Sequence, residues 1–167
     1  MRKSRGSGPE PDGLGSSPAK VRGAALALLG RRDYTASELR QRLIDKEHSR
    51  PDVEAVVDAL IEDRTIDDRR VATSHIRVAS QVKGRGRMRI RQELAARGVD
   101  RHMADELLAD LPPEDEAAAI TKFLARKRYP ATPTALERQK AYQQLLRKGF
   151  TGEAISRAVR GRAPDLD

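Results

Sequence analysis

One stretch of the chain concentrates side chains that could bind a charged partner. Residues 83–99 read KGRGRMRIRQELAARGV, in which a glycine-broken basic loop runs into a short helix that ends at Gly98. Ile90 and Leu94 lie four residues apart and give this helix one apolar face. Arginine outnumbers lysine here, and its planar guanidinium binds carboxylates and phosphates through paired hydrogen bonds. The stretch therefore predicts a surface that docks onto acidic protein or onto phosphate.

The backbone of the basic loop offers a second route to phosphate. A turn through Gly84 and Gly86 could present N–H groups at the positive end of the following helix. A flexible connector with solvated arginines explains the same pattern equally well, and both interpretations stay open. The two glycines also match half of a dinucleotide-binding loop, but no strand precedes them and no third glycine follows at the required spacing. We expect no nucleotide site there.

Side chains suited to catalysis or metal binding are few and scattered. His48, His75 and His102 lie far apart, and none has a second histidine or a carboxylate at a metal-binding spacing. Asp67 and Asp68 precede an apolar helical run, which favours a helix cap and its neighbour over a catalytic pair. The chain has no cysteine, which excludes disulfides and thiolate metal sites and favours the reducing cytoplasm. We predict a protein that is not an enzyme, with no catalytic residue, cofactor, metal or small-molecule substrate.

Charge is distributed in blocks of alternating sign. The net charge is +8, with 33 Lys and Arg against 25 Asp and Glu. Residues 69–101 hold ten Lys or Arg against two acidic residues, and residues 122–162 hold eleven against two. The segments 52–68 and 102–121 are acidic. Such alternation favours a partner with both protein and phosphate surfaces over a uniformly basic coat on nucleic acid.

Aromatic residues are too few for recognition of exposed bases. Only 3% of the residues are aromatic, and Phe123, Tyr142 and Phe150 fall at positions expected to face a core. Stacking on single-stranded bases is therefore improbable. We expect any DNA contact to be to the phosphate backbone, weak and strongly dependent on salt.

Helical periodicity runs through the chain after a Gly-, Ser- and Pro-rich start. Ser17 followed by Pro18 predicts the start of the first helix, and Thr35 with Glu38 predicts a capping box at the second. Asp100 is expected to cap the sixth of about nine helices, and no alternating run is long enough for a strand. The longest apolar run has six residues, so we expect no membrane span, and the N-terminus lacks the apolar core of a secretory signal.

A repeat of 51 residues relates three parts of the chain. Leu43, Leu94 and Leu145 are separated by this spacing, and four residues after each comes an expected helix end, at Glu47, Gly98 and Gly149. We predict an all-α fold, an elongated and curved array of three tandem three-helix repeats without a sheet. The expected boundaries are a disordered tail at 1–17, repeats at 18–65, 66–112 and 113–162, the second of them basic, and a short tail at 163–167.

Four stretches, in order, carry a resemblance to a known family. They are Leu28 to Leu39, Ile66 to Ala72, Lys83 to Val99 and Leu145 to Ile155. On these stretches the sequence resembles the RecX family, bacterial regulators of the RecA recombinase. It departs from the family pattern at Glu47, where a glycine usually closes the second helix, and at Thr65 and Val71.

The resemblance implies a cytoplasmic regulator that binds RecA and its filament on DNA. Such a protein modulates ATP hydrolysis, filament growth and strand exchange, most often by inhibition, in recombinational DNA repair and the SOS response. The alternative is a stand-alone DNA-binding protein with helix-turn-helix-like units, whose basic helix enters a major groove. The residues expected to bind the partner or the DNA backbone are Lys83, Arg85, Arg87, Arg89, Arg91, Arg97 and Arg101, with Lys122, Arg126, Lys127, Arg128, Arg147 and Lys148 as a second set.

Overall fold

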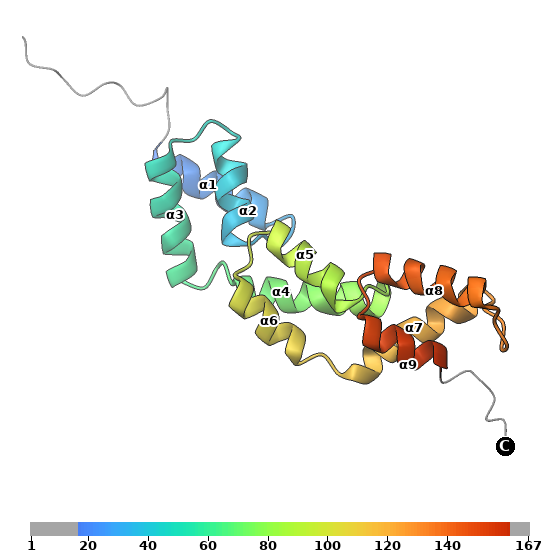
Figure 1. Ribbon diagram of the computed structural model, residues 1–167. Helices are drawn as coiled ribbons and strands as arrows, with labels where there is room; N and C mark the ends of the chain where they lie inside the picture. The colour runs from blue at the N-terminus through green and yellow to red at the C-terminus, as the bar shows by residue number, and fades with distance from the viewer. Residues whose placement is uncertain (1–16, 161–167) are drawn as a thin grey trace, which may run out of the picture. The chain divides into compact units, whose positions relative to one another are not determined.

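The computed structural model describes residues 17–160, and over this range the chain is all helical (Figure 1). It contains no strand there, and the predicted all-α fold is confirmed. The helices are α1 (Pro18–Leu29), α2 (Ala36–Ile44), α3 (Arg50–Glu62), α4 (Asp68–Arg77), α5 (Arg87–Ala96), α6 (Arg101–Ala109), α7 (Pro113–Arg126), α8 (Ala135–Arg147) and α9 (Gly152–Arg160), with a π-helical turn, η1 (Val78–Val82), after α4. Apart from Ser17, the predicted tails lie outside the described residues.

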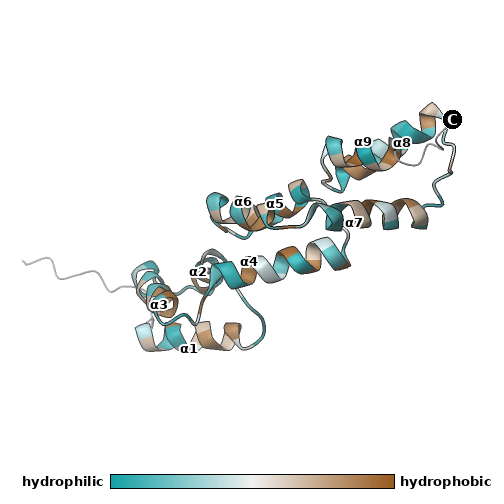
Figure 2. Ribbon diagram, turned by 90° about the horizontal axis from the view of Figure 1, so that it is seen from below, coloured by the Kyte–Doolittle hydropathy of each residue, from teal (hydrophilic) through white to brown (hydrophobic). Residues whose placement is uncertain are grey.

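Hydrophobic burial is organised in three separate cores, one for each set of three helices. Figure 2 shows that single helices mix hydrophobic and hydrophilic residues, as expected for elements with one buried side. The chain forms two compact units, the first ending at Asp67 and the second beginning at Asp68. The first unit holds the core of α1–α3, and the second holds those of α4–α6 and α7–α9. Fully buried side chains of the three cores include Leu39, Leu43 and Leu60, then Ile90 and Leu94, then Ile120, Leu145 and Phe150.

Capping side chains set the helix starts. Thr35 and Glu38 form the predicted capping box of α2, and the Asp100 carboxylate accepts a hydrogen bond from the Met103 N–H at 3.0 Å. Pro18 is the first residue of α1, where its missing N–H costs nothing. The sequence reading missed one capping box, formed by Thr134 at the start of α8.

The helix ends repeat in the predicted register. Glu47, Gly98 and Gly149 all adopt left-handed backbone, with φ of 64°, 72° and 85°. After each, the next N–H donates to a carbonyl five residues back: those of Leu43, Leu94 and Leu145, at 3.3, 3.0 and 3.2 Å. This is the bonding that closes a helix at a left-handed residue. Glu47 performs a glycine's role with a side chain, at a cost in backbone strain.

Helix α4 continues into the π-helical turn η1, which the sequence did not predict. The Lys83 N–H donates to the Val78 carbonyl at 3.1 Å, and the Ser80 hydroxyl donates to the Ile76 carbonyl at 2.8 Å. The wide turn leaves Val82 77% exposed. Turns of this kind frequently interrupt helices at functional sites. No helix in the described part of the chain is both long and apolar enough to cross a membrane.

Candidate partner-binding surface

All thirteen predicted cations belong to the second unit, where they divide into two groups. The arginines on and before α5 contact acidic groups or carbonyls of their own chain, whereas most cations of α7 and α8 do not. This division decides which side chains remain available for a partner.

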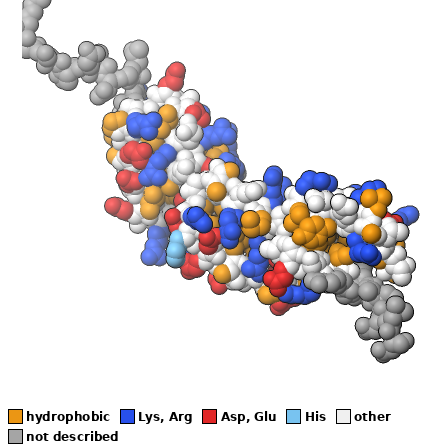
Figure 3. All heavy atoms as spheres, in the orientation of Figure 1, with side chains coloured by type: hydrophobic (Ala, Val, Ile, Leu, Met, Phe, Trp, Pro, Cys, Tyr) orange, Lys and Arg blue, Asp and Glu red, His pale blue; other side chains and the backbone are white. Residues whose placement is uncertain are grey.

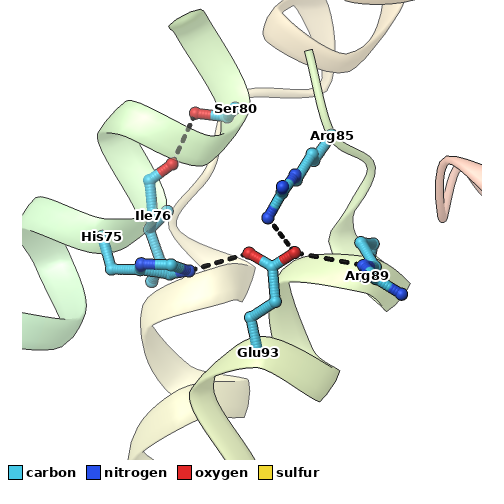
Figure 4. A network of polar contacts seen from close by, with 6 residues as sticks. All are labelled: His75, Ile76, Ser80, Arg85, Arg89 and Glu93. Carbon is cyan, nitrogen blue, oxygen red and sulfur yellow. Dashed lines mark hydrogen bonds and ion pairs between the residues drawn. The ribbon is translucent and has the colours of Figure 1, made fainter. Parts of the chain in front are cut away.

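Glu93 on α5 is the centre of one internal network (Figure 4). Its carboxylate accepts hydrogen bonds from Arg85 and, at 3.1 Å, from Arg89, and it lies 2.9 Å from Nε2 of His75 on α4. Burial alone opposes ionisation of Glu93, yet the hydrogen bond with His75 and the charge of Arg85 outweigh it, so the pKa of Glu93 lies below its usual value. The network holds α4, α5 and the basic loop together.

Arg87 is committed to the junction of the second and third repeats. Its guanidinium donates to the Leu108 carbonyl in the last turn of α6, at 3.0 Å, and to the Leu111 carbonyl just after that helix. Its Nε lies 3.7 Å from the Glu116 carboxylate of α7. Three contacts to carbonyl and carboxylate oxygens make Arg87 a structural residue, because they stabilise the chain between α6 and α7.

The other three predicted arginines on or near α5 differ in how far they are paired and exposed. Arg91 Nε lies 2.7 Å from the Asp105 carboxylate of α6, and Arg101 is 92% exposed with its Nε 3.8 Å from the same carboxylate. Arg97 is half-buried at the end of α5. Reversing the charge of Arg85, Arg87 and Arg91 would therefore disturb folding as well as any docking.

The loop before α5 is anchored through its backbone, which changes both earlier interpretations of it. The Gly86 N–H donates to the Lys148 carbonyl at 2.9 Å, and the Met88 N–H donates to the Gly149 carbonyl at 3.0 Å. The end of α8 therefore caps the start of α5, with opposite ends of the two helix dipoles facing each other (Figure 1). These N–H groups are occupied and cannot cradle a phosphate, and the loop is no flexible connector.

Two glycines make this approach possible. A Cβ on Gly86 would lie 2.3 Å from the carbonyl carbon and oxygen of Gly149, and a Cβ on Gly149 would lie 2.3 Å from the Arg89 nitrogen. The backbones of the second and third repeats thus touch directly. We call this contact the glycine lock, formed by Gly86, Met88, Lys148 and Gly149.

Seven of the predicted cations, one in the loop before α5 and six in the third repeat, have no ion-pair partner among the described residues. Figure 3 shows Lys and Arg side chains gathered along the edge that α8 forms. Burial, followed by the positive charges of Arg126, Arg85 and Lys127, lowers the pKa of Lys148. Positive charge is therefore concentrated and unneutralised here. The unpaired cations are Lys83, Lys122, Arg126, Lys127, Arg128, Arg147 and Lys148.

The histidines do not form a metal site in the described part of the chain. His75 lies against Glu93, and no three His, Asp or Glu residues come together there in a way that could hold a metal ion.

Three residues of this surface were not predicted from the sequence. They are Glu93 at the centre of the network, Ser80 in the π-helical turn, and Gly149 in its contact with Gly86. Glu93 had a visible signal, since it is the one acidic residue among the arginines of residues 85–97. The contact between Gly86 and Gly149 joins residues 63 positions apart and had no local signal.

Comparison with known proteins agrees with this architecture. Models of the first, second and third three-helix domains of RecX match residues 22–60, 67–108 and 114–159. The regulatory protein RecX of Halorhodospira halophila is 36% identical over 148 residues, covering 87% of this chain and 89% of that protein. The RecX protein of Chromohalobacter salexigens is 34% identical over 146 residues, covering 87% of this chain and 95% of its own.

Solved structures show the same fold. The crystal structure of RecX from Lactobacillus salivarius superposes with a TM-score of 0.80 at 22% identity, over 87% of this chain and 96% of that one. A second crystal structure of a regulatory protein RecX gives 0.78 at 26% identity, over 86% of this chain and 71% of the other.

Three tandem three-helix domains, two of them carrying unneutralised cations, define an all-α helical-repeat protein. The three domain matches and the identities to curated relatives make the family plain: this chain belongs to the RecX family of regulatory proteins.

Proposed function

We propose that the protein binds the RecA recombinase and its filament on DNA and restrains ATP hydrolysis, filament growth and strand exchange. The observation that carries the proposal is the ordered match of all three RecX domains across residues 22–159. The unpaired cations of the second unit supply a surface with the charge that a filament of protein and DNA attracts. The protein acts by binding and turns over no substrate of its own.

Two assays test this function together. The protein is sedimented with RecA in the presence and absence of single-stranded DNA, and DNA-dependent ATP hydrolysis by RecA is measured as the protein is added. We expect co-sedimentation with the filament and falling hydrolysis, and no ATP turnover by the protein alone. An unrelated helical protein of similar net charge controls for non-specific attraction. Failure to sediment with the filament, together with unchanged hydrolysis, would refute the proposal.

The alternative of a stand-alone DNA-binding protein receives less support from the geometry. Its basic helix would be α5, but Arg89 and Arg91 on this helix already contact Glu93 and Asp105. Reading bases in a major groove needs side chains free to reach base edges. Selection of random duplexes should therefore return no consensus site, and a strong consensus would favour the alternative.

A further inference from the structure

Four of the unpaired cations, one from the second repeat and three from the third, meet at one groove. The groove has a volume of about 60 Å³ and lies where η1 meets α7 and the end of α8. Lys83 enters from the loop after η1, Lys122 and Arg126 lie one turn apart on α7, and Lys148 comes from the end of α8. No acidic side chain lines it.

The contrast with the rest of the second unit shows that this cluster is unusual. Arg85, Arg89 and Arg91 each lie within 3.1 Å of a carboxylate of the chain. None of the four groove cations has such a partner among the described residues, although their positive charges converge. A site that gathers like charges without a counter-charge is set up to gain one from a ligand.

The groove is held in shape before any ligand arrives. The Lys148 carbonyl accepts the Gly86 N–H in the glycine lock, and the Arg85 N–H donates to the Ala79 carbonyl at 2.9 Å. The Lys148 ammonium also lies 5.4 Å from the centre of the Phe123 ring, which forms part of the floor. The backbone around the groove is therefore fixed before a ligand binds, which lowers the entropy that binding costs.

Size and lining indicate which anion fits. A volume of about 60 Å³ is several times the roughly 10–15 Å³ that a cavity needs to hold one water molecule, so a single tetrahedral anion fits. Phe123 is buried and offers no face for stacking. Four cations from three elements suit the several oxygens of one phosphate better than they suit a carboxylate with two.

We propose that this groove, which we call the phosphate groove, binds a backbone phosphate of DNA through Lys83, Lys122, Arg126 and Lys148. The inference deepens the proposed function, since the filament supplies the DNA. It is tested on free DNA without recombinase, so either proposal can fail alone. A bound phosphate bridges Lys83 of the second repeat and the other three cations of the third, and so adds to the glycine lock.

The test compares two matched double variants of the full-length chain. Lys122→Glu with Arg126→Glu reverses two groove charges four residues apart. Arg42→Glu with Lys46→Glu reverses one arginine and one lysine at the same spacing in the first unit, where both are exposed. Circular dichroism establishes that both variants fold. Binding of a short fluorescent single-stranded oligonucleotide is followed by anisotropy between about 50 and 200 mM salt.

We expect the groove variant to bind DNA about tenfold or more weakly than wild type at the lowest salt. Its salt slope should fall by about 0.7, because the groove contacts one phosphate and each contacted phosphate of a single strand contributes about that much. The control variant should keep the wild-type affinity and slope. Wild-type affinity and slope in the groove variant would overturn the proposal.

Two further measurements separate phosphate from an acidic protein surface. DNA should protect Lys122 and Lys148 from an amine-modifying reagent and leave Lys140, outside the groove, reactive. A polyglutamate peptide should compete poorly with the oligonucleotide. A peptide that binds as tightly as DNA, and loses its binding in the groove variant, would show that the groove takes acidic protein and would overturn the choice of phosphate. Modification of Lys122 and Lys148 that DNA leaves unchanged would also overturn it.

Discussion

Replacing Gly86 by alanine tests whether the glycine lock holds the second unit together. The added Cβ would meet the carbonyl carbon and oxygen of Gly149 and the Phe150 nitrogen, each at 2.3 Å. These are backbone atoms and cannot rotate away as a side chain would, so the two repeats must separate locally. Separation breaks the hydrogen bonds from the Gly86 and Met88 N–H groups, at 2.9 and 3.0 Å.

The size of the effect follows from those two bonds. A buried backbone group left without a partner costs roughly 1–3 kcal/mol. Two such groups, with partial access of water after the shift, give an expected loss of about 2–4 kcal/mol in the free energy of unfolding of the second unit. This is a large share of the stability of an ordinary domain.

Urea unfolding followed by circular dichroism measures the loss, and hydrogen exchange with mass spectrometry locates it. Peptides that cover residues 84–90 and 146–152 should exchange faster in Gly86→Ala, and peptides of the first unit should not change. Gly23→Ala is the matched control, because that glycine lies inside α1 with no atom within 4 Å of the added Cβ. Gly23→Ala should raise the free energy of unfolding of the first unit by about 0.5–1 kcal/mol, because alanine favours a helix more than glycine does. An unfolding free energy and exchange pattern for Gly86→Ala equal to those of wild type would refute the reasoning.

Three further predictions concern stability. Glu47→Gly should stabilise the first unit by about 1 kcal/mol in urea unfolding, because Glu47 has φ of 64°; an unchanged or lower stability would contradict the strain. Glu93→Gln should lower the free energy of unfolding of the second unit by about 2 kcal/mol at neutral pH. The pKa of Glu93 is lowered in the folded chain, so its contribution is full above the unfolded pKa and is lost as pH falls through the folded one. The difference in unfolding free energy between wild type and variant should thus shrink as the pH falls through the lowered pKa of Glu93, and a constant difference would contradict the network. Arg87→Lys should lower the midpoint of thermal unfolding by several degrees, since lysine cannot reach two carbonyls and the Glu116 carboxylate together; an unchanged midpoint would show that these contacts add nothing.

Most of the fold could be predicted from the sequence, because its signals are local. Capping residues such as Thr35 and Asp100 act within one turn, and a helix end at Gly98 or Gly149 depends on one residue's backbone. The repeat of 51 residues placed Glu47 in the same role despite its side chain, because the register outweighed residue type. The π-helical turn was invisible, since nothing in Val78–Val82 sets it apart from an ordinary helix.

The site was harder to predict, because neutralisation of charge depends on contacts between distant residues. Arg91 and Lys122 both stand in basic stretches of the sequence, yet Arg91 meets Asp105 while Lys122 meets no carboxylate among the described residues. A count of charges along the chain cannot separate these cases. That all thirteen cations bind a partner stays a prediction. The unpaired cations test it more sharply than the paired ones do.

The most direct test of the account measures DNA-dependent ATP hydrolysis by RecA in the presence of three forms of the protein. These are wild type, the groove variant with Lys122→Glu and Arg126→Glu, and the control variant with Arg42→Glu and Lys46→Glu. We predict that the control inhibits at the wild-type concentration and that the groove variant needs a concentration about tenfold higher or more, in line with the loss of the phosphate contact in the groove. Equal inhibition by all three forms would contradict the claim that the unpaired cations of the third repeat dock the protein onto the filament.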